Sequence, residues 1–196
     1  MDMTCTLPLR VLPAALLLVA ACLSGCMQES PADMLVADLY ADTPSVQHDA
    51  AQHLAEMGEP AVSPLIGVFS SGDPSASQWA AAALCQIGEP AIDPLIRSLS
   101  TEDNAAREWG ILTLACIGAP AVDPLVAQLK TGNELRHAAV KTALIRIGEP
   151  ALPALAALRG SADAQLAGDA GEIIQSIYLT AQFKAERANA TAESDP

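Results

Sequence analysis

Aromatic residues are scarce in this chain of 196 residues, where Phe, Trp and Tyr together make up 3%. Its core must therefore be built from Ala, Leu, Ile and Val, a composition that favours helices and argues against a β-sandwich. Charged residues are also few, at 17%, while hydrophobic residues reach 51%. These proportions argue against an intrinsically disordered chain.

Positive charge is the second shortage. The chain has 10 Lys and Arg against 23 Asp and Glu, a net charge of −13, and no Lys or Arg between residues 11 and 96. Nucleic acids and anionic lipid surfaces both attract basic residues, so neither is an expected partner. We interpret residues 27–96 as a solvated acidic surface, with steering of a basic protein partner as the alternative.

Motifs for catalysis and metal binding are missing as well. The chain has no Gly-rich phosphate loop, no H-E-x-x-H and no Gly-x-Ser-x-Gly. His48, His53 and His137 are the only histidines, and His53 has Asp49 and Glu56 at helical spacing. A small metal or acid–base cluster is conceivable there, but position 53 belongs to a packing column, which favours a partly buried structural His. No metal, cofactor or small-molecule substrate is therefore expected.

The N-terminal residues predict a secretory signal. The apolar run of residues 11–21 is shorter than the roughly 20 residues that span a bilayer and has the length of a secretory h-region. It ends in the tetrapeptide Leu-Ser-Gly-Cys closing at Cys26, which resembles the lipobox of bacterial lipoproteins.

That resemblance implies removal of residues 1–25 as a lipoprotein signal peptide. It also implies two or three acyl chains, palmitate among them, on Cys26. Several chains give a stable anchor, because a single chain binds membranes only marginally. The expected location is the bacterial cell envelope, and Met27 in place of Asp favours the outer over the inner membrane. Residues 26–30 would be the lipidated Cys and a short tether.

One unit of 30 residues is repeated along the rest of the chain. Its signature Gly-x-Pro-Ala-aliphatic-x-Pro-Leu starts at Gly58, Gly88, Gly118 and Gly148, with Pro60, Pro90, Pro120 and Pro150 two residues later, and the last copy has Ala for the second Pro. Residues that form helix N-caps recur with the same period at Thr43, Asp73, Asp103, Asn133 and Asp163.

Each unit predicts two helices. A first helix of about ten residues starts between the two prolines, 90 or 94 in one unit. A second helix of about fourteen residues follows the cap, and a Gly such as Gly88 ends it with positive φ. One unit buries too little apolar surface to offset its conformational entropy, so neighbouring units must stack.

The prediction is an all-α solenoid over residues 31–188. Its repeats are 28–57, 58–87, 88–117, 118–147 and 148–177. Tyr178 replaces the Gly of the other units, so a capping helix is expected to continue to about residue 188. Residues 189–196 are predicted to be a disordered tail.

The recurring patterns Gly-x-Pro-Ala-aliphatic-x-Pro-Leu and Ala-x-x-x-Leu-x-x-Ile-Gly resemble the HEAT-repeat family, in particular its short bacterial form, the PBS-lyase HEAT-like repeat. The resemblance implies an α-solenoid and leaves the function open, because one fold hosts many functions. We expect a membrane-anchored lipoprotein that acts as a non-catalytic scaffold for an unidentified protein partner. One alternative is an enzyme or accessory subunit, lyase-like or metal-dependent, centred on His53, and another is a structural spacer in an envelope complex.

A candidate binding face lies on the second helices of two consecutive repeats. Trp79 and Trp109 occupy the same repeat position, and Ala82, Leu112 and Cys116 fall on or near the side away from the core. An exposed apolar strip with Trp is typical of a protein-binding hot spot. The alternative is that the two rings fill gaps between repeats.

Cys85 and Cys116 lie near the ends of these same two helices. A disulfide between them is conceivable in an oxidising envelope. Two small, buried apolar side chains are favoured, because neighbouring helix axes lie about 8–10 Å apart and a disulfide needs Cα atoms within roughly 7 Å.

Overall fold

The computed structural model describes residues 30–130 and 133–193. Residues 31–196 form a compact unit distinct from residues 1–30, and every buried core residue of the described chain lies in that unit. The predicted signal peptide and Cys26 lie outside the described residues. The described part is helical and contains no strand.

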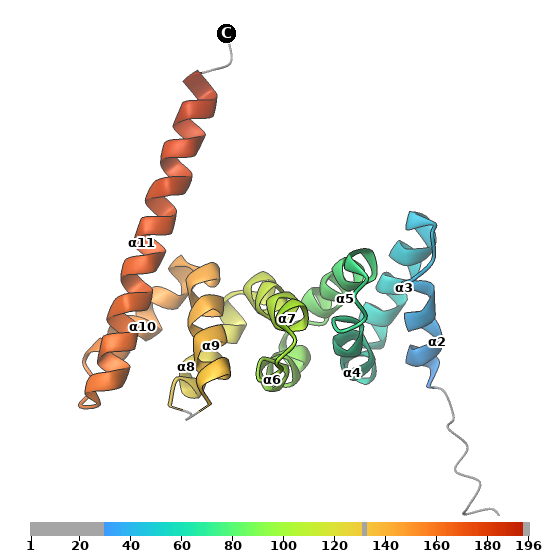
Figure 1. The fold of residues 1–196 in the computed structure, drawn as a ribbon, viewed down its shortest axis with the longest axis horizontal. Coiled ribbons are helices and arrows are strands. Elements are labelled where there is room, and N and C mark those ends of the chain that lie inside the picture. Colours follow the sequence, from blue (N-terminus) through green and yellow to red (C-terminus); the bar gives the residue numbers. More distant parts are fainter. Residues whose placement is uncertain (1–29, 131–132, 194–196) are drawn as a thin grey trace, which may run out of the picture. The chain divides into compact units, whose positions relative to one another are not determined.

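Every predicted repeat contains a first and a second helix (Figure 1). The first helices are α2 (Pro31–Asp38), α4 (Glu59–Val68), α6 (Glu89–Ser98), α8 (Val122–Gln128) and α10 (Leu152–Arg159). The second helices are α3 (Pro44–Met57), α5 (Pro74–Ile87), α7 (Asn104–Ile117), α9 (Glu134–Ile147) and α11 (Ala164–Glu193). Consecutive first helices contact one another, and so do consecutive second helices, which confirms the predicted all-α solenoid.

The second helices begin directly after the predicted cap residues, and all but one of these residues cap the helix with a side-chain hydrogen bond. The Asp73 carboxylate accepts hydrogen bonds from the backbone N–H groups of Ser75 and Ala76, at 2.8 and 3.0 Å. Side chains at the equivalent positions 103, 133 and 163 also accept from backbone N–H groups of the first turn. Thr43 has the extended backbone of a cap but no side-chain cap bond, in line with the weaker capping by Thr.

In the four repeats with the Pro motif, helical structure begins next to the first Pro, and no first helix starts at the second Pro. The helices α4 and α6 begin one residue before the first Pro and include the second Pro, which is Pro64 in α4 and Pro94 in α6. In the next two repeats a 3-10 turn, Ala119–Ala121 or Glu149–Ala151, holds the first Pro and precedes the α-helix. A Pro so close to a helix start removes few hydrogen bonds, because the first-turn N–H groups have no partner within the helix.

The repeat glycines end the second helices with the positive φ that was predicted. At Gly58, Gly88, Gly118 and Gly148 φ is 69–78° and ψ lies between −125° and −134°. This ψ places them in the mirror image of the β region rather than in the left-handed helical region. Glycine reaches it readily and other residues rarely do.

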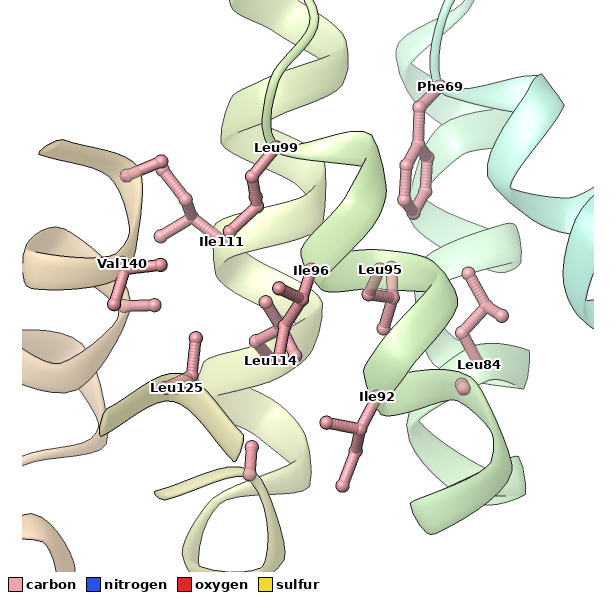
Figure 2. Close-up of a cluster of buried hydrophobic side chains, with 14 of the residues drawn as sticks. Phe69, Leu84, Ile92, Leu95, Ile96, Leu99, Ile111, Leu114, Leu125 and Val140 are labelled. Carbon is pink, nitrogen blue, oxygen red and sulfur yellow. The ribbon is translucent and has the colours of Figure 1, made fainter. Parts of the chain in front are cut away.

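The core is a continuous aliphatic layer between the first and second helices (Figure 2). Two columns of Leu, one from each helix layer, are fully buried. They are Leu54, Leu84, Leu114 and Leu144 in the second helices and Leu65, Leu95, Leu125 and Leu155 in the first helices. Phe69, at the end of α4, is the only aromatic residue in this buried core among the described residues.

The last helix is longer than predicted. It continues to Glu193, so residues 189–193 of the predicted tail are helical. Seven of the nine residues from 185 to 193 are Ala, Glu or Arg, which have high helix propensity, and the prediction of a tail gave this too little weight. No single helix of the described chain is long and apolar enough to cross a bilayer. The pair Asn104–Ile117 and Ala119–Gln128 meets that criterion only jointly, by length and composition, across a bend of 114°.

Candidate protein-binding surface

The predicted face lies on the outer side of α5 and α7. Leu112 is 37% exposed, Cys116 is exposed and Ala82 is half-buried. Leu112 and Cys116 are one helical turn apart on α7, and Ala82 is the residue of α5 equivalent to Leu112. The helices contact each other, so these side chains form one patch that crosses a repeat boundary.

A disulfide joins the two helices within this patch, contrary to the favoured prediction of two buried thiols. Cys85 and Cys116 are bonded, with their Cα atoms 5.8 Å apart. The prediction applied the distance between helix axes to a limit that concerns Cα atoms. Because Cα atoms lie about 2.3 Å from the axis, the Cα atoms of residues that face each other across axes about 9 Å apart approach to roughly 4–5 Å.

Trp79 lies at the boundary between the first two repeats and contacts residues of the first. Its indole Nε1–H donates to the Gln47 side-chain oxygen at 2.9 Å, and its ring lies edge-on to His48 at a centroid distance of 5.4 Å. Gln47 is itself buried and donates its amide N–H to the Leu39 carbonyl at 2.9 Å. Ser75 donates its hydroxyl to the same Gln47 oxygen. The amide therefore links three segments of two repeats.

Trp109 occupies the same position at the next boundary, where its ring makes an aromatic contact. It stacks on Phe69 with centroids 6.3 Å apart and an angle of 21° between the planes. Both Trp rings are partly buried against the core. They fill spaces between repeats, which was the alternative reading of the pair, so Leu112 and Cys116 are the exposed part of the predicted face.

Two of the histidines lie in different environments. His53 is exposed rather than partly buried, because it faces away from the rest of the stack on the first second-layer helix. His137 lies at a repeat boundary, with Nε2 3.0 Å from an Asp169 oxygen. Within residues 30–130 and 133–193, no three His, Cys, Asp or Glu side chains are grouped so as to hold a metal ion.

Ion pairs connect the later repeats. Lys141 of α9 contacts Asp169 and Glu172 of α11 at 3.2 and 2.5 Å. Burial lowers the pKa of Lys141, but hydrogen bonds and charge attraction from the two carboxylates outweigh it and raise the pKa above its ordinary value. Arg146 likewise pairs with Glu108 of the preceding repeat. The first two repeats contain no Lys or Arg for such pairs.

The first-helix layer carries a shallow groove of about 360 Å³ between α4 and α6. Val62 and Ile66 of α4 line one side, Pro94 of α6 lines the other, and Glu59 and Arg97 are also part of the lining. The groove shows which positions meet between neighbouring first helices. Val62 and Ile66 lie on the side of α4 that faces the next repeat, and Pro94 lies on the side of α6 that faces the preceding repeat.

Comparison with protein families agrees with the repeat architecture. The family profile for HEAT repeats matches residues 32–115 and 68–141. No curated protein matches the chain. A crystal structure of an engineered protein is 21% identical and has a TM-score of 0.29, covering 76% of this chain and 48% of that one, so the chain spans about half its length. A computationally designed armadillo repeat protein for modular peptide recognition is 21% identical with a TM-score of 0.30, covering 72% of this chain and 80% of that one. These scores are too low to carry conclusions about function.

Proposed function

Because the chain belongs to the HEAT-repeat family, we propose that it is a non-catalytic scaffold that binds a protein partner through the outer face of α5 and α7. We call this face the outer patch and define it by Ala82, Leu112 and the Cys85–Cys116 disulfide. Solenoids present extended surfaces on which such binding is common. The proposal assigns the contact to repeats two and three.

The observation that carries the proposal is a contrast between equivalent positions. The repeat position of Ala82 and Leu112 is held by polar residues in the other three repeats, namely Gln52, Thr142 and Glu172. Because three repeats fold with a polar residue at this outward position, folding does not require the exposed Leu112 in the third repeat. A large apolar side chain next to a rigid covalent link is suited to the centre of a protein interface.

The proposed location is the bacterial cell envelope, with a lipid anchor on Cys26. The lipobox resemblance supports the anchor. The Cys85–Cys116 bond supports an oxidising compartment, since disulfides persist there and are reduced in the cytosol. Replacement of Cys26 by Ser tests the anchor: the protein should move from the membrane fraction to the soluble fraction. A variant that stays in the membrane fraction would contradict it.

The binding surface is tested with substitutions to the residue that another repeat of the chain has at the same position. The variant Ala82→Gln/Leu112→Gln introduces the residue that the first repeat has at this position, Gln52. The control Thr142→Gln places the same residue at the equivalent position of the fourth repeat. Residues 31–196 of each form are immobilised and incubated with envelope extract.

The proposal predicts an envelope protein that is captured by the wild type and by the control. Its recovery on the double variant should fall about tenfold or more, which corresponds to about 1.4 kcal/mol of binding free energy. Equal capture by all three forms would exclude the outer patch. Circular dichroism spectra that match the wild type would show that the double variant remains folded.

A further inference from the structure

The two ends of the repeat stack both expose residues whose equivalents are buried inside it. At the N-terminal end Val46 is 40% exposed and His53 is exposed, while the residues equivalent to them in the second repeat, Ala76 and Ala83, are fully buried. At the C-terminal end Arg159 is exposed, while the residues equivalent to it in the second and third repeats, Phe69 and Leu99, are buried. Terminal repeats of solenoids normally carry a polar outer face, and here Val46 and Tyr178 add exposed apolar surface, 40% and 57% exposed, to the two ends.

The C-terminal end also contains an open groove of about 610 Å³. Ile174, Gln175 and Tyr178 of α11 line it, together with Arg159 at the end of α10. By repeat position, this is the side on which every earlier repeat receives the next one. The groove is therefore a vacant place for a further repeat.

The internal contacts define which positions meet across a repeat boundary. Phe69 of the second repeat stacks on Trp109 of the third. The residue equivalent to Phe69 in the last repeat is Arg159, and the residue equivalent to Trp109 in the first repeat is Asp49. If the first repeat of another molecule occupied the groove in the same register, a guanidinium would face a carboxylate where the internal boundary has two aromatic rings.

Asp169 shows that a carboxylate at this position forms such pairs. It is the residue of the last repeat equivalent to Asp49, and it already contacts Lys141 and His137 across a repeat boundary. In the last repeat the positions of His137 and Lys141 are held by Ala167 and Gly171. Small residues there leave room for the long Arg159 side chain to supply the positive charge instead.

We propose that a second copy of this chain stacks head to tail on the first. The N-terminal repeat of one copy occupies the groove on α11 of the other, and Arg159 pairs with Asp49 across the junction. Arg159 and Asp49 are both exposed, and neither makes an ion pair within the part of the chain that the structure describes. Opposite charges at two ends of one molecule favour a contact between unlike surfaces.

Two further pairs of positions agree with this register. Gln175 and Glu56 are equivalent to Cys85 and Cys116, so an amide would meet a carboxylate where the internal boundary has a disulfide. Met34 is equivalent to Pro94, and Leu152 to Val62, so an exposed Met would meet an apolar residue as Pro94 does. Contact between unlike surfaces does not close on itself, so it builds rings or longer rows of molecules. This surface is separate from the outer patch and goes beyond the proposed function.

Charge reversal tests the junction by sedimentation velocity of residues 31–196. The wild type should gain mass with increasing concentration, while Arg159→Glu and Asp49→Arg should each remain monomeric, because each variant has ends of like charge. An equimolar mixture of the two variants should associate again, since every junction then joins opposite charges. Lys130→Glu and Glu102→Arg make the same charge changes at exposed positions far from both ends and should associate like the wild type.

Several results would overturn the proposal. One is a wild type that stays monomeric at the highest soluble concentration. Another is a mixture of the two variants that stays monomeric although both are folded by circular dichroism. Association that is lost with Arg159→Glu but kept with Asp49→Arg would indicate a symmetric tail-to-tail dimer in place of the head-to-tail row.

Discussion

Removal of the Cys85–Cys116 disulfide should destabilise the solenoid strongly. The bond joins residues 31 apart in sequence, on helices of adjacent repeats. Loop-closure entropy predicts that a cross-link over such a span stabilises the folded chain by roughly 3–4 kcal/mol. Since about 1 kcal/mol shifts the melting temperature of a domain of this size by roughly 2–4 °C, we expect a decrease of about 6–16 °C.

The variant for this test is Cys85→Ala/Cys116→Gln. Both replacements occur naturally at the equivalent positions of a neighbouring repeat, as Ala115 and Gln86, so they suit the local packing. Thermal and urea unfolding of the variant is followed by circular dichroism, with and without a reducing agent. The reduced wild type should unfold like the variant, and the variant should not respond to the reducing agent.

The reasoning would be refuted if the oxidised wild type and the variant unfolded at the same temperature and urea concentration. Thiol labelling of the unfolded, unreduced wild type provides a second check. Two reactive thiols, from positions 85 and 116, would mean that the bond does not form. If no thiol reacts and the two proteins still unfold alike, the bond is present and the estimate from loop-closure entropy is wrong.

Three other changes test the local interpretation. Gly88→Ala should lower the free energy of unfolding by about 1–3 kcal/mol through backbone strain alone, because no atom lies within 4 Å of the added methyl group; Gly67→Ala, inside α4 and equally uncrowded, should be neutral or stabilising in the same urea titration. Asp73→Ala removes a helix cap and should cost about 0.5–2 kcal/mol, while Thr43→Ala, which removes no cap bond, should leave thermal unfolding unchanged. Because the pKa of Lys141 is raised in the folded chain, its stabilising effect is fully present below its ordinary value of 10.5 and is lost as the pH rises further; urea titrations across this range should show a steeper alkaline loss for the wild type than for Lys141→Met.

The fold was predictable because its determinants are local and repeat with a fixed period. A cap such as Asp73 and a turn such as Gly88 act within a few residues, so their spacing gives the helix boundaries directly. The length of α11 was underestimated because no Gly or Pro marks an end after Tyr178 and propensity alone continues the helix.

The candidate site was only partly predictable because its character depends on neighbours about thirty residues away. The partner of the Trp79 indole is Gln47, and nothing in the sequence near either residue indicates the other. His53 is exposed because it belongs to the first repeat, although its column is buried elsewhere. The disulfide required the distance between two Cα atoms, which a helix pattern does not provide.

The position of the disulfide also determines how the chain responds to mechanical force. A pull applied between the two termini separates repeats that are held by noncovalent contacts. The segment between Cys85 and Cys116 cannot be extended, because its ends are covalently joined. At about 3.3–3.6 Å per residue, roughly 100 Å of contour length is withheld from the stretched chain. Strain at the centre of the solenoid therefore passes through a sulfur–sulfur bond, and Leu112 of the outer patch lies within the segment that is not extended.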